Sequence, residues 1–104
     1  MSDPTSALVR ALRRRFPDLR VEQAESRLWA SGAIVGTRHR IGFSSRGEQC
    51  DACANLFLAD LDRERFEISG HLLADIAVVS DERTGGGLDR SVRIGIDALT
   101  VEQA

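Results

Sequence analysis

The sequence predicts an α+β fold in which an N-terminal helix packs on an antiparallel, meander-like sheet of four or five strands. Three observations predict it. Apolar residues recur every fourth position near the start of the chain, at Leu8, Leu12 and Phe16. Apolar and polar residues alternate over residues 33–44, and they alternate again along two stretches of the last third. The first spacing is helical, whereas strict alternation is typical of half-buried strands.

The bulk properties indicate one soluble domain over residues 1–104, since domains usually hold about 100–200 residues. The chain is 42% hydrophobic and 29% charged, which is ordinary for a globular protein. No apolar run approaches the roughly 18 residues of a membrane span, and no apolar segment resembles a signal peptide. We therefore expect a cytoplasmic protein without structural disulfides.

Two residue types are missing from the chain. All 14 basic residues are arginine, and there is no tyrosine. A Schiff-base lysine, a P-loop lysine and a tyrosine general acid are thereby excluded. An arginine-only basic set in a chain rich in alanine and glycine favours a GC-rich bacterial genome as its source.

The N-terminal helix has recognisable ends. Asp3 suits the N-cap position and Pro4 the first helical position. Pro17 prevents the helix from continuing. Three arginines, at positions 13–15, fall in the expected last turn, where cations interact favourably with the helix dipole.

Two strands follow, over residues 19–30 and 33–44, with Ser31 and Gly32 as the expected tight turn. This turn places Glu25 opposite Arg38 and Leu28 opposite Val35. Alternate side chains of the second strand then share one face, namely Val35, Thr37, His39, Ile41 and Phe43. Arg38 and Arg40 point to the other face.

Residues 52–65 are ambiguous. The segment contains no valine, isoleucine or threonine, and Asp51 could cap a second short helix near residues 52–62. The apolar run is nevertheless short and is bounded by a turn-like stretch, which favours a buried strand.

The last third predicts a long β-hairpin. Apolar residues occupy even positions in both arms: Phe66, Ile68, Leu72, Ala74, Ile76 and Val78, then Val92, Ile94, Ile96 and Ala98. The connection, residues 80–90, contains three consecutive glycines, which suit a flexible tip. No Lys-Ser or Lys-Thr pair follows these glycines, as a P-loop requires.

Cys50 and Cys53 are the only cysteines, in a Cys-x-x-Cys arrangement. They are weak candidates for a metal site, because a structural zinc needs four ligands and the two histidines lie far apart in the sequence. They are equally weak candidates for a redox pair, since Asp51 between them disfavours a thiolate. The simpler interpretation is a small buried residue and a loop thiol.

A second candidate site lies on the predicted long hairpin. His71, Asp75, Arg93 and Asp97 all occupy odd positions, opposite the apolar even face. They form a candidate ligand-binding or interface face. Leu73, Val79 and Leu99 are expected on the same face, and apolar residues among polar ones favour a surface that a partner covers.

Charge is unevenly distributed along the chain. Residues 1–46 hold nine arginines against four acids, whereas residues 47–104 hold five against twelve. A basic patch for nucleic acid is conceivable at Arg10, Arg13, Arg14, Arg38 and Arg40. The pI of about 5.6 and the scarcity of stacking aromatics argue against it. Neighbouring segments of opposite charge within one fold explain the asymmetry equally well.

The sequence therefore favours a non-catalytic interaction or assembly module that self-associates as a homo-oligomer or binds a protein partner, with no cofactor and no membrane contact. Long strands leave edges that must be covered or paired, and pairing with another copy is one solution. The alternatives are a nucleic-acid-binding module that uses arginines of the first helix, and a redox or zinc protein that uses Cys50 and Cys53.

Overall fold

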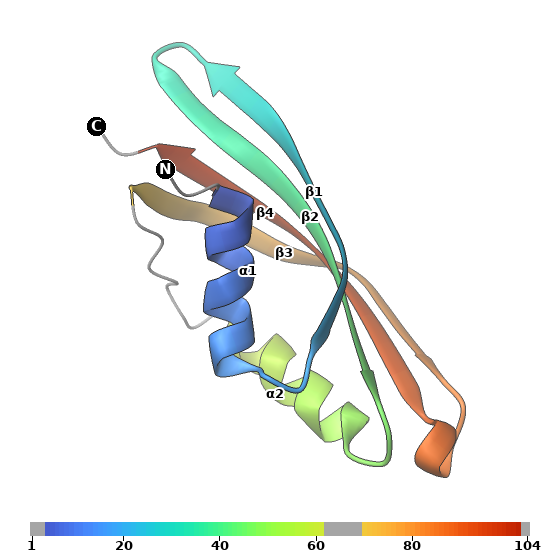
Figure 1. Ribbon diagram of the computed structural model, residues 1–104. Coiled ribbons are helices and arrows are strands. Elements are labelled where there is room, and N and C mark those ends of the chain that lie inside the picture. Colours follow the sequence, from blue (N-terminus) through green and yellow to red (C-terminus); the bar gives the residue numbers. More distant parts are fainter. Residues whose placement is uncertain (1–3, 62–69, 103–104) are drawn as a thin grey trace.

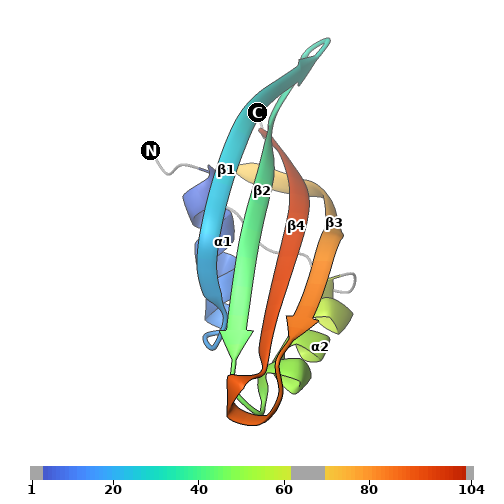
Figure 2. The same cartoon turned by 90° about the vertical axis from the view of Figure 1, so that its right-hand side faces the viewer.

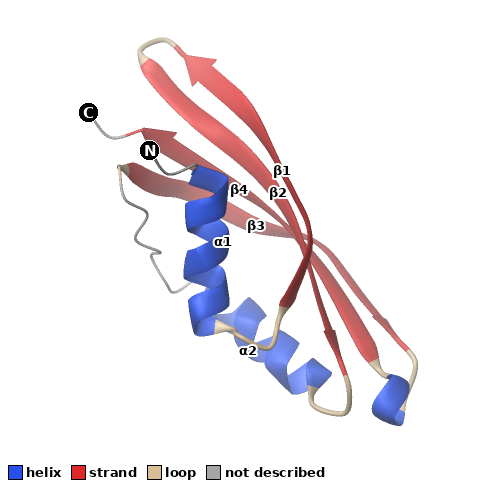
Figure 3. Cartoon of the chain, in the orientation of Figure 1, coloured by secondary structure: helices blue, strands red, loops and turns tan. Residues whose placement is uncertain are grey.

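The computed structural model describes residues 4–61 and 70–102. Their elements follow the order α1 (Pro4–Arg15), β1 (Arg20–Ser31), β2 (Ile34–Arg46), α2 (Cys50–Leu61), β3 (His71–Thr84), a short 3-10 helix (Gly87–Asp89) and β4 (Ser91–Glu102) (Figure 1). Helix and strand segments are distinguished in Figure 3. The predicted α+β class, with an N-terminal helix and an antiparallel meander-like sheet, is confirmed, and the sheet has four strands.

The strands lie in the order β1-β2-β4-β3, and all neighbours are antiparallel. Both α-helices cover the same side of the sheet, as the two views in Figures 1 and 2 show. We call this side the helix face and the opposite side the outer face. The molecule is elongated, 50 × 23 × 20 Å, because the β1–β2 hairpin projects past the N-terminal end of α1.

Helix α1 buries the apolar stripe that its sequence predicts. Leu8 and Leu12 are fully buried, and Phe16, directly after the helix, is 8% exposed. Each such side chain contributes about 1.5–3 kcal/mol when it is fully buried. The backbone N–H of Phe16 still bonds to the carbonyl of Leu12, at 3.0 Å, and Pro17 follows it.

The central strands β2 and β4 supply the other half of the core. Their predicted alternation is confirmed, since the buried apolar residues are Ile41, Phe43, Val92, Ile94, Ile96 and Ala98. Phe57 of α2 packs between the two layers. Its ring centroid lies 4.8 Å from that of Phe16 and 5.2 Å from that of Phe43.

The segment that favoured a buried strand is a helix, so that interpretation was wrong. The alternative, a second short helix near residues 52–62, agrees with α2. The helix buries a stripe with helical spacing: Cys50, Ala54, Phe57 and Leu61. Asp51 lies in the first turn and not at the N-cap, because the helix begins at Cys50. Residues 62–65, with Phe66 and Ile68, lie outside the described residues.

The register of the first hairpin also differs from the prediction. Glu25 pairs with Arg40 instead of Arg38, and Leu28 pairs with Thr37 instead of Val35. The turn starts at Gly32, whose φ is +60°, instead of ending there. A positive φ at the first central residue alone is the pattern of a II′ turn, which favours glycine in that position. From Gln23 to Ser31 this change moves partners by two residues and leaves the side chains on their predicted faces. A further shift between Val21 and Gln23 turns Val21 towards the core.

Strand β3 departs further from the predicted alternation. Its register against β4 shifts twice, between Leu73 and Asp75 and between Val78 and Ser80. Each shift inserts a residue and reverses which parity faces inward. Leu73 and Ile76 therefore both pack against the core, whereas Leu72, predicted to be inside, is 53% exposed.

Candidate functional site

The outer face of the sheet is a surface that the α-helices leave open. None of the helices in residues 4–61 and 70–102 lies on it (Figure 2). The cross-strand register places Gln23 beside Gly42, Gly42 beside Gly95, and Gly95 beside Ser80. Two adjacent glycines on the two central strands leave a gap in the layer of side chains. The centre of the outer face is consequently hollow.

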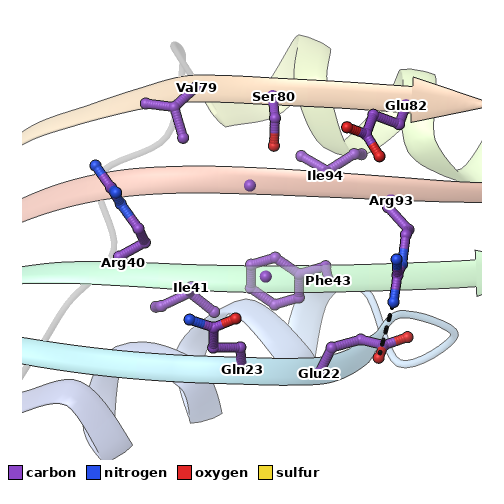
Figure 4. A pocket seen from close by; sticks show the side chains of 12 residues that line it. Glu22, Gln23, Arg40, Ile41, Phe43, Val79, Ser80, Glu82, Arg93 and Ile94 are labelled. Carbon is purple, nitrogen blue, oxygen red and sulfur yellow. Dashed lines mark ion pairs between the residues drawn. The ribbon is translucent and has the colours of Figure 1, made fainter.

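This hollow measures about 600 Å³ and is open to solvent. Arg40 lies at one end, and Arg93 with Glu82 lies at the other (Figure 4). A Cβ atom at Gly95 would lie 2.5 Å from the hydroxyl oxygen of Ser80, so even an alanine would force that side chain to move. Glycine at this position therefore sets the depth of the hollow.

The charges around the hollow are paired with one another. Arg40 makes two hydrogen bonds to Asp97, Nε to Oδ1 at 2.9 Å and Nη2 to Oδ2 at 3.2 Å. These bonds raise the pKa of Arg40 and lower that of Asp97. Arg93 lies 3.7 Å from a carboxylate oxygen of Glu22. The pKa of Glu22 is lowered, first by a hydrogen bond from Ser44 and then by Arg93.

These paired charges also bear on the uneven distribution of charge along the chain. Arg40 of the basic first half meets Asp97 of the acidic second half, whereas the other pair joins Glu22 of the first half to Arg93 of the second. The asymmetry of charge along the sequence is thus partly compensated inside the fold. Around the hollow, the described residues include no nucleophile bonded to a base.

The four residues that were predicted to share a candidate face, at odd positions of the last hairpin, lie on two different faces of the sheet. Asp75, Arg93 and Asp97 lie on the outer face. His71 lies on the helix face, because it pairs with Glu102 and the register shift between Leu73 and Asp75 separates it from Asp75. The four predicted residues therefore do not share one face of the sheet. Of its members, Arg93 lines the hollow, and Asp97 binds Arg40 at its rim.

The proposed basic patch is divided as well. Arg10, Arg13 and Arg14 belong to α1 on the helix side, whereas Arg38 and Arg40 point to the outer face. The sheet stands between the two groups. Arg40 is bonded to Asp97, and Arg38 lies opposite Leu99.

The two cysteines lie in the first turns of α2. Cys50 is 2% exposed, and its thiol lies 3.5 Å from the carbonyl oxygen of Arg90. Cys53 is half-buried, and burial raises its thiol pKa, with further contributions from Asp18 and Cys50. A reactive cysteine has a lowered pKa, so this shift runs in the opposite direction. In the described residues, no group of three or more histidine, cysteine or acidic side chains is arranged to hold a metal ion.

One buried histidine connects the helix layer to the sheet. Sequence reasoning predicted only which face of the sheet it lies on. His39 is fully buried. Its Nδ1 lies 2.8 Å from the Thr5 hydroxyl of α1, and its Nε2 lies 2.8 Å from the Thr100 hydroxyl of β4. The alternation of β2 predicted that His39 faces inward, but no local pattern identified its partners, which are 34 and 61 residues away.

The projecting hairpin carries exposed apolar side chains. Leu28 is 80% exposed, Ile34 54% and Val35 41%. On the outer face, Trp29 pairs with Gly36, and Gly36 pairs with Val101 of β4. Leu28 and Val35 lie on the helix face, and Trp29 and Ile34 lie on the outer face, so this end of the sheet carries apolar side chains on both sides. Larger exposed apolar surfaces mark interaction sites more often than isolated side chains do. The sequence analysis did not identify these side chains as an exposed set.

Comparison of the chain with protein-family models, with curated proteins and with solved structures gives no match. Among the described residues, no helix combines the length and the apolar character that crossing a membrane requires. A functional assignment must therefore be argued from the geometry of the sheet and its edges.

Proposed function

We propose that this protein is a non-catalytic assembly module whose copies associate through the β1–β2 hairpin and the adjoining edge of the sheet. The observation that carries the proposal is the exposure of Leu28, Ile34 and Val35, which are 80%, 54% and 41% exposed on a hairpin that projects past α1. Burying apolar surface yields about 25 cal/mol per Å². A second copy that covers this hairpin would therefore stabilise the complex.

The arrangement of charge supports an assembly role. The ion pairs of the outer face join β2 to its neighbour β4, and join β1 to β4 across β2. They leave that face polar and balanced in sign instead of strongly basic. A surface of this kind suits a protein partner better than a phosphate backbone, which binds clustered positive charge.

Sedimentation velocity over a wide concentration range tests the proposal. The wild-type protein should shift from the mass of one chain, 11.4 kDa, towards twice that mass as its concentration rises. Leu28→Ser should weaken the association, because it removes the most exposed apolar side chain of the hairpin.

Leu88→Ser is the matched control. Leu88 is 77% exposed, close to the value for Leu28, but it lies in the 3-10 helix between β3 and β4. Figure 1 shows this helix at the end of the molecule opposite the β1–β2 turn. Its loss should leave the association unchanged. A wild-type protein that stays at the mass of one chain at every concentration contradicts the proposal.

A further inference from the structure

Strand β1 forms an open and regular edge of the sheet. Within residues 4–61 and 70–102, β2 is the only strand that pairs with it. Its register shifts once, between Val21 and Gln23, and is unbroken from there to Ser31. Residues 23–31 contain no proline, glycine or lysine, the residues that commonly interrupt or protect an edge. The opposite edge, β3, is interrupted twice.

The backbone of β1 has a defined set of groups available for pairing. The two-residue turn is closed by the pair Ser31–Ile34. Bonded and non-bonded pairs alternate along an antiparallel ladder, so odd-numbered residues of β1 bond to β2. The N–H and C=O groups directed to the open edge then belong to Ala24, Ser26, Leu28 and Ala30.

The side-chain charges select one register for a two-fold pair of β1 strands. A two-fold axis perpendicular to the sheet keeps each face on its own side, so it lies midway between one residue of β1 and the same residue of the second copy. An axis at Glu25 opposes two glutamates, and an axis at Arg27 opposes two arginines. An axis at Ser26 places Glu25 of each copy directly opposite Arg27 of the other. Opposite charges in this position stabilise a strand pair, whereas like charges destabilise it.

The Ser26 register also uses the edge groups. Ser26 pairs with its own counterpart, and Leu28 pairs with Ala24 of the second copy, so these bonded pairs involve only residues whose backbone groups face outward. The small side chain of Ala24 leaves room beside Leu28, which is 80% exposed in the single chain. Hydrogen bonding permits this axis, and the pairing of opposite charges selects it.

We infer that two copies of this protein pair antiparallel along β1, with Ser26 on the two-fold axis and with Glu25 and Arg27 bonded across it. The inference rests on the proposed assembly function and specifies its interface. The two four-stranded sheets join into one continuous sheet, and both helix layers lie on the same side. Each projecting hairpin then runs beside the first half of the partner copy's β1.

Charge reversal tests the register. Glu25→Arg places arginine opposite Arg27 of the second copy, and Arg27→Glu places glutamate opposite Glu25. Each variant alone replaces two attractive pairs by two repulsive ones, so its dimer dissociation constant should rise by about tenfold or more. Mixing the two variants restores both opposite-charge pairs, so a mixed dimer should form with about wild-type affinity. Native mass spectrometry distinguishes it from the two homodimers by mass.

The same pair of variants controls for effects within one chain. Glu25 lies opposite Arg40 and Arg27 lies opposite Arg38 on β2, so the two reversals should change the folding stability of a single chain in opposite directions. Weakened self-association in both, with recovery only in the mixture, supports the Ser26 register. Dimers that resist both reversals, or a mixture that does not recover, overturn the register but leave the assembly function in place. A wild-type protein that never associates overturns both.

Discussion

Asp51, in the first turn of α2, accepts two hydrogen bonds from the guanidinium group of Arg90, at 3.0 and 3.2 Å. Arg83 of β3 donates a third, also at 3.0 Å. Arg83 bonds to Asp81 and Asn55 as well, so the first two turns of α2 are bound to β3 and, through Arg90, to the residue before β4. This cluster fixes the position of α2 against the sheet, and Cys50 with it.

The Asp51 cluster predicts a loss of stability in acid. Hydrogen bonds from Arg90, and then from Arg83, hold the pKa of Asp51 below its ordinary value. A carboxylate whose pKa is lowered by folding contributes stability that is complete above the unfolded value of about 3.9 and is lost as the pH falls through the folded value. In Asp51→Asn this contribution is absent. The melting temperature of the wild type should therefore fall more steeply than that of the variant between about pH 5 and pH 2.

The comparison isolates Asp51 from the other carboxylates. The pKa values of Glu22 and Asp97 are also lowered, but both proteins contain them, so their effect cancels in the difference. Asp89→Asn, at an exposed position near the same hairpin tip, should follow the wild-type curve. Parallel curves for the wild type and Asp51→Asn would show that the cluster contributes nothing.

The buried His39 predicts a specific sensitivity at Thr100. Thr100→Val keeps the shape of the side chain and removes the hydroxyl that bonds to Nε2 of His39. Loss of one partner from a fully buried polar pair costs about 1–3 kcal/mol. Thr100→Ser retains the hydroxyl and should lose less. Urea denaturation followed by circular dichroism measures both, and equal stabilities for the two variants would contradict a role for this bond.

The Cys-x-x-Cys segment predicts slow thiol chemistry. Burial raises the pKa of Cys53, and Cys50 is 2% exposed, so the folded protein should react with a disulfide reagent near pH 8 roughly tenfold or more slowly than the same chain in urea. Cys50→Ser isolates the reaction of Cys53. A folded protein that reacts faster than the unfolded chain would instead favour the redox interpretation.

The parts of the fold that could be predicted are those that depend on side-chain period alone. Ile41 and Phe43 on β2, and Ile94 and Ile96 on β4, alternate without interruption and are buried as expected. Helix α1 shows the same agreement at helical spacing. Helix α2 could have been identified from the spacing of its buried residues, which are Cys50, Ala54, Phe57 and Leu61. Apolar residues also occupy its other sides, so this buried stripe is not distinct in the sequence.

The parts that could not be predicted depend on partners distant in the chain. The register shift between Leu73 and Asp75 is set by pairing with β4, and nothing in the sequence of β3 marks it. That shift moved His71 away from Asp75 and divided the predicted candidate site. The hollow at Gly42 and Gly95 has the same origin, since the two glycines become neighbours only when β4 lies beside β2.

The sequence by itself determined the class of the fold, the inward face of the central strands and the composition of the edge strand β1. These follow from local spacing and from the residues that each segment contains. Only the tertiary structure decided which charges meet, because an ion pair such as Arg40–Asp97 joins residues 57 positions apart. It also decided that β1 is an edge, since strand order depends on how the whole sheet closes around its core. The proposed pairing of Glu25 with Arg27 of a second copy needs both kinds of information.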